Sequence, residues 1–324
     1  MYFKNLTNED IEEIKKFLDT VITYTSPYTR WALLSISRLS PSHYAHSKWG
    51  HRFVSFFLFP SIEREIDIYD EESGFVHRRK YIDLILEWID RMLTNIALDL
   101  YLKVNPVNII KSFVNYAVKL SNWYNEYLTL TNKIEKDERI VKNIQSLEKY
   151  ISEALEHFRL FGHGFMPPET IDKIIYALVD IDLGKRKITI DEAFELTKVS
   201  KKFLEDKLGR VKTVVYTGGG IHILVHIEDK VSQVPLILES DLVIKNNELR
   251  NLLKMFKTVK ETEKVVKETQ SKVIKPVLKE LKEYLTNEFK TIIDIDLENS
   301  LTAYIRIPAT INRKWNVKTR LIEI

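Results

Sequence analysis

IIYALVDID, residues 174–182, is an almost wholly apolar run that ends in two aspartates. Its length and composition predict a buried strand. Alternate residues of a strand point to the same face, so Asp180 and Asp182 project together while Val179 and Ile181 face the core. Two such carboxylates repel each other unless a cation lies between them or one takes up a proton. The pair is therefore a candidate metal site, and the alternative is a strand end that simply enters a loop.

The same pattern returns in TIIDIDL, residues 291–297, where Asp294 and Asp296 share one face of a predicted strand. A third carboxylate from a neighbouring strand is what a two-metal site needs, because each divalent ion binds several oxygen ligands. The chain contains no cysteine, which excludes disulfides and thiolate zinc sites and favours hard cations. These aspartates are therefore candidate ligands of a hard divalent cation such as Mg²⁺ or Mn²⁺, and no zinc is expected.

Glycine is scarce, with nine in the chain where average usage would give about 23. Three are consecutive: Gly218, Gly219 and Gly220. They join strands predicted at 211–216 and 221–227, and the N–H groups of such a turn can approach phosphate oxygens, as can the following His222. The turn is a candidate triphosphate site, and a plain glycine hairpin is the alternative. His222 and His226 lie about 13 Å apart along a strand, too far to share one ion.

The segment AYIRIPATINRKWNVKTRLIEI, residues 303–324, concentrates basic side chains. They are Arg306, Arg313, Lys314, Lys318 and Arg320. Such a group can neutralise the phosphates of a triphosphate or of a nucleic-acid backbone, and a solvated terminus is the alternative. Over the whole chain 49 basic and 46 acidic residues leave a formal net charge of only +3, so nucleic-acid binding would depend on a local patch.

The remaining pattern predicts helices and strands in alternation. Amphipathic spacing predicts helices at 8–22, with Thr7 or Asn8 as the cap, and at 191–208. Further expected elements are a helix at 28–38, strands at 64–69 and 75–81, helices through 82–160, a strand at 235–244, a helical stretch at 247–288 broken at Pro276, and paired strands at 291–297 and 302–308. The predicted fold class is α/β or α+β with a mixed sheet.

Glycines and prolines between 162 and 168 mark an internal boundary. The predicted domains are an N-terminal helical region (1–48), a catalytic core (49–81 and 166–324) and a helical insertion (82–165). No run approaches the roughly eighteen apolar residues that cross a bilayer, and the start of the chain is too acidic and amphipathic for a secretory signal. We therefore expect a cytoplasmic protein with no membrane partner.

Taken in chain order, these segments resemble the motifs of the archaeo-eukaryotic primase superfamily, in particular the archaeal primase small catalytic subunit and plasmid or viral primase-polymerases. That family carries an hDhD strand, a small-residue turn ending in G-x-H, an hD strand and an R-x-P-x-S-x-H-x-K-like segment. The matching segments here are LVDID, TGGGIH, IID and RIPATINRK. The last has Arg306, Pro308 and Lys314 at matching places, with Asn312 where the family has histidine. The cysteine-rich zinc knob of cellular small subunits is absent.

A weaker similarity concerns REIDI (64–68) and FVHRRKY (75–81), which are similar to the strand pair that precedes the first motif in archaeal small subunits. It implies that four charged side chains lie near the catalytic core. They are Arg64, Glu65, His77 and Arg78. The resemblance does not extend to 82–165.

The resemblance implies an RRM-like primase-polymerase core, which makes primers on a single-stranded DNA template from NTPs or dNTPs by two-metal nucleotidyl transfer. The metal ligands would be Asp180, Asp182 and Asp294, and the nucleotide-binding residues Gly218, Gly219, Gly220, His222, Arg306 and Lys314. A primase large subunit or a helicase would be a further partner. Two alternatives stay open: an end-extending or repair polymerase of the same superfamily that does not start chains, and a non-catalytic replication subunit.

Overall fold

The computed structural model describes residues 3–22, 29–37, 52–59, 61–69, 74–93, 98–108, 170–184, 186–237 and 248–323, with isolated helical positions between 110 and 145. The chain forms two compact units. The first consists of Met1–Pro106, Lys173–Gln233 and Lys267–Ile324, and the second of Val107–Asp172 and Val234–Val266. Every candidate site residue belongs to the first unit. Within the described ranges, no helix combines the length and hydrophobicity that a membrane crossing requires.

The α-helices named here lie in stretches where the sequence predicts helix, and each extends at most one residue beyond them. α1 (Asn8–Val21) begins after Thr7, whose side chain accepts a hydrogen bond from the N–H of Asp10 while the Asp10 carboxylate accepts one from the N–H of Thr7. This reciprocal capping box stabilises the first turn, and it confirms Thr7 as the cap. Further helices are α3 (Tyr81–Leu93), α6 (Ile190–Lys207), α8 (Glu248–Thr269) and α9 (Lys275–Phe289).

The strands form two larger sheets and two small hairpins. The first sheet runs in the order β11-β5-β1-β2 and contains β1 (Thr29–Ser37), β2 (Arg52–Phe59), β5 (Leu98–Lys103) and β11 (Tyr304–Arg306). The second sheet runs in the order β10-β7-β9-β8-β14 and contains β7 (Tyr176–Leu183), β8 (Arg210–Tyr216), β9 (Gly220–His226), β10 (Ile293–Ile295) and β14 (Arg320–Ile322). The hairpins pair β3 (Glu65–Tyr69) with β4 (Val76–Lys80) and β12 (Ile311–Asn312) with β13 (Val317–Lys318), and β6 (Val107–Asn108) belongs to the second unit.

The two faces of β7 have different surroundings. Val179 and Ile181 are fully buried on one face, and α6 contacts the neighbouring strands β8 and β9. On the other face Tyr176 and Leu178 join a hydrophobic core with side chains of the first sheet. Since side chains alternate along a strand, Asp180 lies on this second face, beyond the point where the core ends. One strand thus carries an apolar half and an acidic half on the same face.

That core also holds the first sheet to its helices. Phe17 and Leu18 of α1 and Ile85 and Ile89 of α3 pack into the same cluster as Trp31 of β1. Burying each such side chain stabilises the fold by about 1.5–3 kcal/mol relative to leaving it exposed. The α+β class is confirmed by this arrangement of helices and antiparallel sheets. The predicted mixed sheet is wrong for the second sheet, whose strands are antiparallel throughout the described residues.

The helix predicted at 28–38 is wrong, because this stretch forms β1. Trp31, Ala32, Leu33 and Leu34 are all fully buried. A strand that is covered on both faces shows no alternation of apolar and polar residues. Without that alternation, its leucine and alanine residues favoured the prediction of a helix. The helical prediction through 82–160 is also wrong at 98–103, which forms β5. Most of the stretch beyond residue 108 lies outside the described residues.

The pairing predicted between 291–297 and 302–308 is wrong as well. β10 pairs with β7 of the second sheet, whereas β11 pairs with β5 of the first. The partner of a short strand is decided by packing far along the chain, which a local pattern does not report. Of the strand predicted at 235–244, residues 235–237 carry no strand, and the rest lies outside the described residues.

A π-helical turn, Gln270–Ile274, interrupts the long helical stretch between α8 and α9. The predicted break at Pro276 falls in the first turn of α9, where proline is tolerated. The turn buries Gln270, whose side-chain amide donates to the carbonyl of Leu297 at 2.8 Å and accepts from the N–H of Leu301 at 3.3 Å. The hydrogen bonds of Gln270 therefore hold the loop that follows β10 against the π-helical turn.

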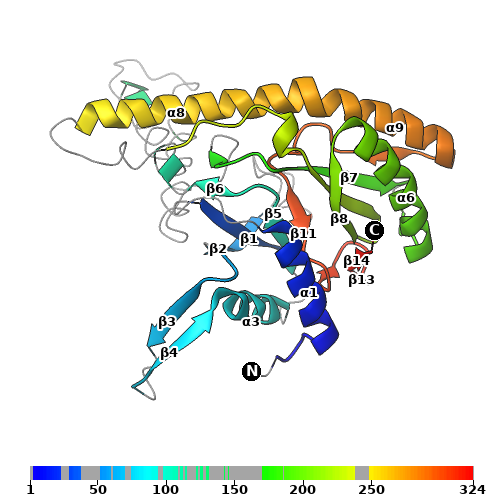
Figure 1. Cartoon of the computed structure of the whole chain (residues 1–324), viewed down its shortest axis with the longest axis horizontal. Helices are drawn as coiled ribbons and strands as arrows, with labels where there is room; N and C mark the ends of the chain where they lie inside the picture. The colour runs from blue at the N-terminus through cyan, green and yellow to red at the C-terminus, as the bar shows by residue number, and fades with distance from the viewer. Residues whose placement is uncertain are drawn as a thin grey trace. The chain divides into compact units, whose positions relative to one another are not determined.

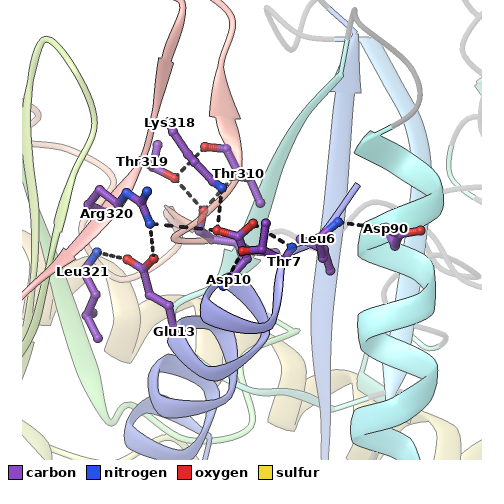
Figure 2. Close-up of polar contacts among 11 residues, drawn as sticks. Leu6, Thr7, Asp10, Glu13, Asp90, Thr310, Lys318, Thr319, Arg320 and Leu321 are labelled. Carbon is purple, nitrogen blue, oxygen red and sulfur yellow. Dashed lines mark hydrogen bonds and ion pairs between the residues drawn. The ribbon is translucent and has the colours of Figure 1, made fainter. Parts of the chain in front are cut away.

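The first helix is tied to the C-terminal strands by charged side chains, which we call the terminal cluster: Asp10, Glu13, Lys318 and Arg320 (Figure 2). Asp10, only 1% exposed, pairs with Lys318, and Glu13 accepts hydrogen bonds from Arg320 at 3.0 Å and from the N–H of Leu321. Two segments from opposite ends of the chain are thereby joined through opposite charges.

Candidate functional site

The strand register places the candidate carboxylates side by side. Asp182 lies opposite Asp294 of β10 on one side and opposite Gly220 of β9 on the other. Asp180 lies opposite His222 of β9. Directly opposed residues of an antiparallel pair have Cβ atoms about 4.5–5.5 Å apart on the same face. The three carboxylates, which we call the acid cluster, therefore share one face of two neighbouring strands.

The side chains of the acid cluster also have partners of their own. Asp180 Oδ1 lies 3.3 Å from His222 Nε2, and Asp294 Oδ1 lies 3.6 Å from Lys282 Nζ of α9. Both carboxylates are accessible, with side chains 44% and 66% exposed. Among the described residues, no three acidic or histidine side chains converge as they stand on a point where one metal ion would bind. Coordination of a shared ion would therefore require rotation of at least one of these exposed side chains.

The carboxylates of the acid cluster carry like charges and affect each other's pKa values. Burial raises the pKa of Asp182, and the charges of Asp180 and Asp294 raise it further, against the opposing effect of Lys314 and His222. Burial alone would also raise the pKa of Asp180, but the neighbouring His222, with Arg306 and Lys314, outweighs it and lowers that pKa. The local excess of negative charge and the all-oxygen donor set both fit a hard divalent cation.

His222 is held from two sides. It is only 6% exposed, and its Nδ1 accepts a hydrogen bond from the backbone N–H of Arg306 at 3.2 Å. A nitrogen that accepts carries no proton, so the proton of the neutral ring lies on Nε2, which faces Asp180. The imidazole thus acts on Asp180 as a donor. Its predicted contact with a triphosphate is not tested by this arrangement.

Arg306 is buried and its charge is paired. Its guanidinium donates to the fully buried Asp99 of β5 at 3.0 Å and lies 4.7 Å from the ring centroid of Tyr101. The side chain is 5% exposed. A triphosphate would reach this group only after the pair with Asp99 had opened. In this structure Arg306 acts instead on the position of His222.

The glycine turn is packed against the C-terminal hairpin. Gly218 has a φ of +96°, which favours glycine. A Cβ on Gly219 would lie 2.5 Å from Trp315 Nε1, and one on Gly220 would lie 1.7 Å from the carbonyl oxygen of Ile181. The three residues are buried. Close packing by Trp315 and by β7 therefore accounts for the glycines in this structure, and an approach by phosphate remains a prediction.

Lys314 lies at the tip of the β12–β13 hairpin. Its side chain is exposed, its Nζ lies 4.7 Å from the ring centroid of Trp315, and its charge lowers the pKa of both Asp180 and Asp182. Asn312, which stands where the resembling family has histidine, is buried and donates to the carbonyl of Thr217 before the glycine turn. Lys314 is thus the basic residue of the hairpin whose charge acts on two carboxylates of the acid cluster.

Other charged residues of the sequence analysis have structural partners. Asp296 accepts from the N–H of Glu298 at 2.9 Å and so caps a turn after β10. Lys318 and Arg320 belong to the terminal cluster. Arg78 pairs with Asp67 across the β3–β4 hairpin. Figure 1 shows the β3–β4 hairpin beside α3. Hydrogen bonds between Arg79 and Glu87 join the two.

Sequence reasoning missed two charged residues of the site. Lys282 of α9 contacts Asp294 from a helix whose register against the sheet no local pattern gives. Asp99 lies in a stretch expected to be helical, although LDLYLK (98–103) alternates in the manner of a strand and so held a usable signal.

Comparison with known proteins gives no relative for this chain: no protein-family model, curated protein or solved structure matches it. Functional inference therefore depends on the geometry of the site and on the motifs of the sequence.

Proposed function

We propose that this protein is a metal-dependent nucleotidyltransferase of the primase-polymerase type, which makes primers on a single-stranded DNA template from nucleoside triphosphates. The observation that carries the proposal is the register of Asp182 opposite Asp294 and of Asp180 opposite His222. Carboxylates from separate strands meet on one accessible face, next to an exposed lysine. Such a cluster costs electrostatic energy and serves no evident structural purpose.

The connectivity of the second sheet supports the proposal. In chain order the elements are β7, α6, β8, β9, the helical stretch from α8 to α9, and β10, and in space the strands lie as β10-β7-β9-β8, with β14 added beside β8. This is the β-α-β-β-α-β order of the split βαβ arrangement, to which RRM-like cores belong. The acid cluster lies on the strands β7 and β10 of that arrangement. Its position agrees with the motif order on which the resemblance to primases depends.

The reaction would be transfer of a nucleotidyl group. The oxygen of a 3′-hydroxyl forms a bond to the α-phosphorus of the triphosphate, the bond from that phosphorus to the bridging oxygen breaks, pyrophosphate leaves, and the hydroxyl proton passes to water. Asp180, Asp182 and Asp294 would hold the divalent ions, which lower the pKa of the hydroxyl and neutralise the leaving group when bound. Lys314 would neutralise triphosphate charge, and His222 would orient Asp180.

The direct test is incubation with unprimed single-stranded DNA, labelled nucleotides and Mn²⁺, followed by separation of the products by length. We expect short products from the wild-type protein and none from Asp182→Asn. The matched control is Asp296→Asn, which makes the same change beside β10 and keeps an oxygen for the turn; it should retain activity. Extension of a supplied primer without products on unprimed DNA would support the end-extending polymerase instead. No incorporation under either condition would exclude the proposed activity.

A further inference from the structure

Asp99 is a buried carboxylate with two partners from the C-terminal segment. It is fully buried on β5. Its Oδ1 accepts one hydrogen bond from the guanidinium of Arg306 and a second from the backbone N–H of Arg313, both at 3.0 Å. A buried charge is costly unless it is paired and hydrogen-bonded, and apolar side chains of similar volume often stabilise a core as well or better. Stability alone therefore does not account for an ion pair at this place.

The first contact leads to the acid cluster through His222. Asp99 and the ring of Tyr101 hold the side chain of Arg306 on β11. The backbone N–H of the same Arg306 donates to His222 Nδ1, and His222 Nε2 faces Asp180 at 3.3 Å. The chain of contacts therefore runs from the first sheet to the second and ends at a carboxylate of the acid cluster.

The second contact leads to the β12–β13 hairpin. Arg313 follows Asn312, the last residue of β12, and precedes Lys314. Lys314 donates its own N–H to Asn312 Oδ1 at 3.0 Å, which closes the turn. A hydrogen bond from the preceding residue to Asp99 fixes the start of that turn against β5. The backbone of Lys314 is thereby fixed in place, while its ammonium group stays exposed.

We infer that Asp99 is a positioning residue, which sets the ring of His222 against Asp180 and fixes the backbone of the turn that carries Lys314. The inference rests on the proposed function and deepens it, because it names the buried group that fixes two residues of the site. Partners outside the first ligand shell of a metal site typically account for 10- to 100-fold in metal affinity or activity. Asp99 touches neither the substrate nor the metal in this account, and it acts through Arg306 and the backbone of Arg313.

The test uses the full chain as wild type, Asp99→Asn and Asp99→Ala, with two measurements. The ¹⁵N chemical shifts of the His222 imidazole, assigned with His222→Gln, report the tautomer of the ring without any reaction. The KM for the triphosphate and the kcat report the site at work. We expect wild type to show the Nε2–H tautomer. The signals should move toward a mixture of tautomers in Asp99→Asn and further in Asp99→Ala, with a rise in KM of about tenfold for Asp99→Asn.

The matched control is Asp90→Asn, which changes another buried carboxylate that accepts backbone N–H groups, here from Lys4, Asn5 and Leu6. It should lower stability but leave the His222 signals and the KM unchanged. If Asp90→Asn moves them as Asp99→Asn does, the effect is general destabilisation and the inference is wrong. It is also wrong if Asp99→Asn matches wild type in the His222 signals, even if Asp99→Ala does not fold. A wild-type protein without activity overturns the proposed function, while the His222 signals still decide the role of Asp99.

Discussion

Two groups of charged side chains in the first unit differ in how their charges are arranged. The acid cluster gathers three carboxylates on one face of β7 and β10. The terminal cluster places Lys318 and Arg320 around Asp10 and Glu13 (Figure 2). The pKa of Asp182 is raised by burial and by its acidic neighbours. Burial alone would also raise the pKa of Asp10, but Lys318 and Thr7 lower it instead.

The terminal cluster has a structural explanation, whereas the acid cluster calls for a functional one. Opposite charges that join elements distant in the chain stabilise the fold, and the terminal cluster does this for α1 and β14. Like charges on an accessible face oppose folding, so their presence needs another reason. The predictions below change one carboxylate of each cluster, and a lysine beside the acid cluster, and compare the consequences for the site and for stability.

The largest effect is expected for Asp182→Asn. Nucleotide incorporation should fall by more than about 100-fold, since loss of an outer partner of a metal site alone costs 10- to 100-fold. The free energy of unfolding should not fall at neutral pH, because the substitution removes repulsion among the carboxylates. Incorporation assays and urea denaturation of the same preparation measure both quantities. If Asp182→Asn lowers both the activity and the free energy of unfolding, Asp182 has a structural role like that of Asp10.

The second effect is expected for Asp10→Ala. This change removes the capping box of α1 and leaves Lys318 without its buried carboxylate, so the free energy of unfolding should fall by about 2–3 kcal/mol. Urea denaturation at neutral pH measures the change. The control is Glu12→Ala, which removes an exposed carboxylate of the same helix and should change stability by less than about 0.5 kcal/mol. Equal effects of the two substitutions would contradict the role given to the terminal cluster.

The terminal cluster should also respond to acid. The pKa of folded Asp10 is lowered from its ordinary value of 3.8. A carboxyl group with a lowered folded pKa contributes stability above its unfolded pKa and loses it as the pH falls through the folded one. The difference in unfolding free energy between wild type and Asp10→Ala should therefore be constant above about pH 5 and narrow below pH 3.8. If the difference in unfolding free energy increased in acid, the pKa of folded Asp10 would be raised and not lowered.

The smallest effect is expected for Lys282→Gln. Its ammonium group lies 3.6 Å from the Asp294 carboxylate, the two side chains are 40% and 66% exposed, and exposed pairs contribute about 0–1 kcal/mol. Thermal unfolding should therefore change little. Manganese binding should become slightly tighter, because a cation that competes for Asp294 has been removed. Weaker manganese binding would indicate that Lys282 supports the site instead of competing with it.

Strands with a clear boundary were predictable from the sequence. β7, β8 and β9 are confirmed close to their expected bounds, because apolar runs separated by glycine and polar residues define strands locally. The same holds for the β3–β4 hairpin. β1 was not predictable in this way, since burial of both faces removed the alternation that identifies a strand. The partners of β10 and β11 depend on packing between distant segments.

The acid cluster was predictable in part. The spacing of Asp180 and Asp182 fixes their common face, whereas the pairing of Asp294 with Asp182 is a tertiary property. Arg306 illustrates the limit of composition, because a basic residue in a basic segment proved to be buried against Asp99. The glycine turn illustrates the limit of motif reasoning. Its glycines leave room for Trp315, which lies where a side chain would otherwise be. No pattern in the turn itself predicts this contact.

The most direct test of the acid cluster is a titration with Mn²⁺ followed by electron paramagnetic resonance, in which free and bound ions give distinct signals. We predict that wild type and Asp296→Asn bind manganese, and that the double variant Asp182→Asn/Asp294→Asn loses this binding while it unfolds at the same urea concentration or a higher one. Equal manganese binding by the double variant and by wild type would contradict the assignment of these carboxylates to a metal site.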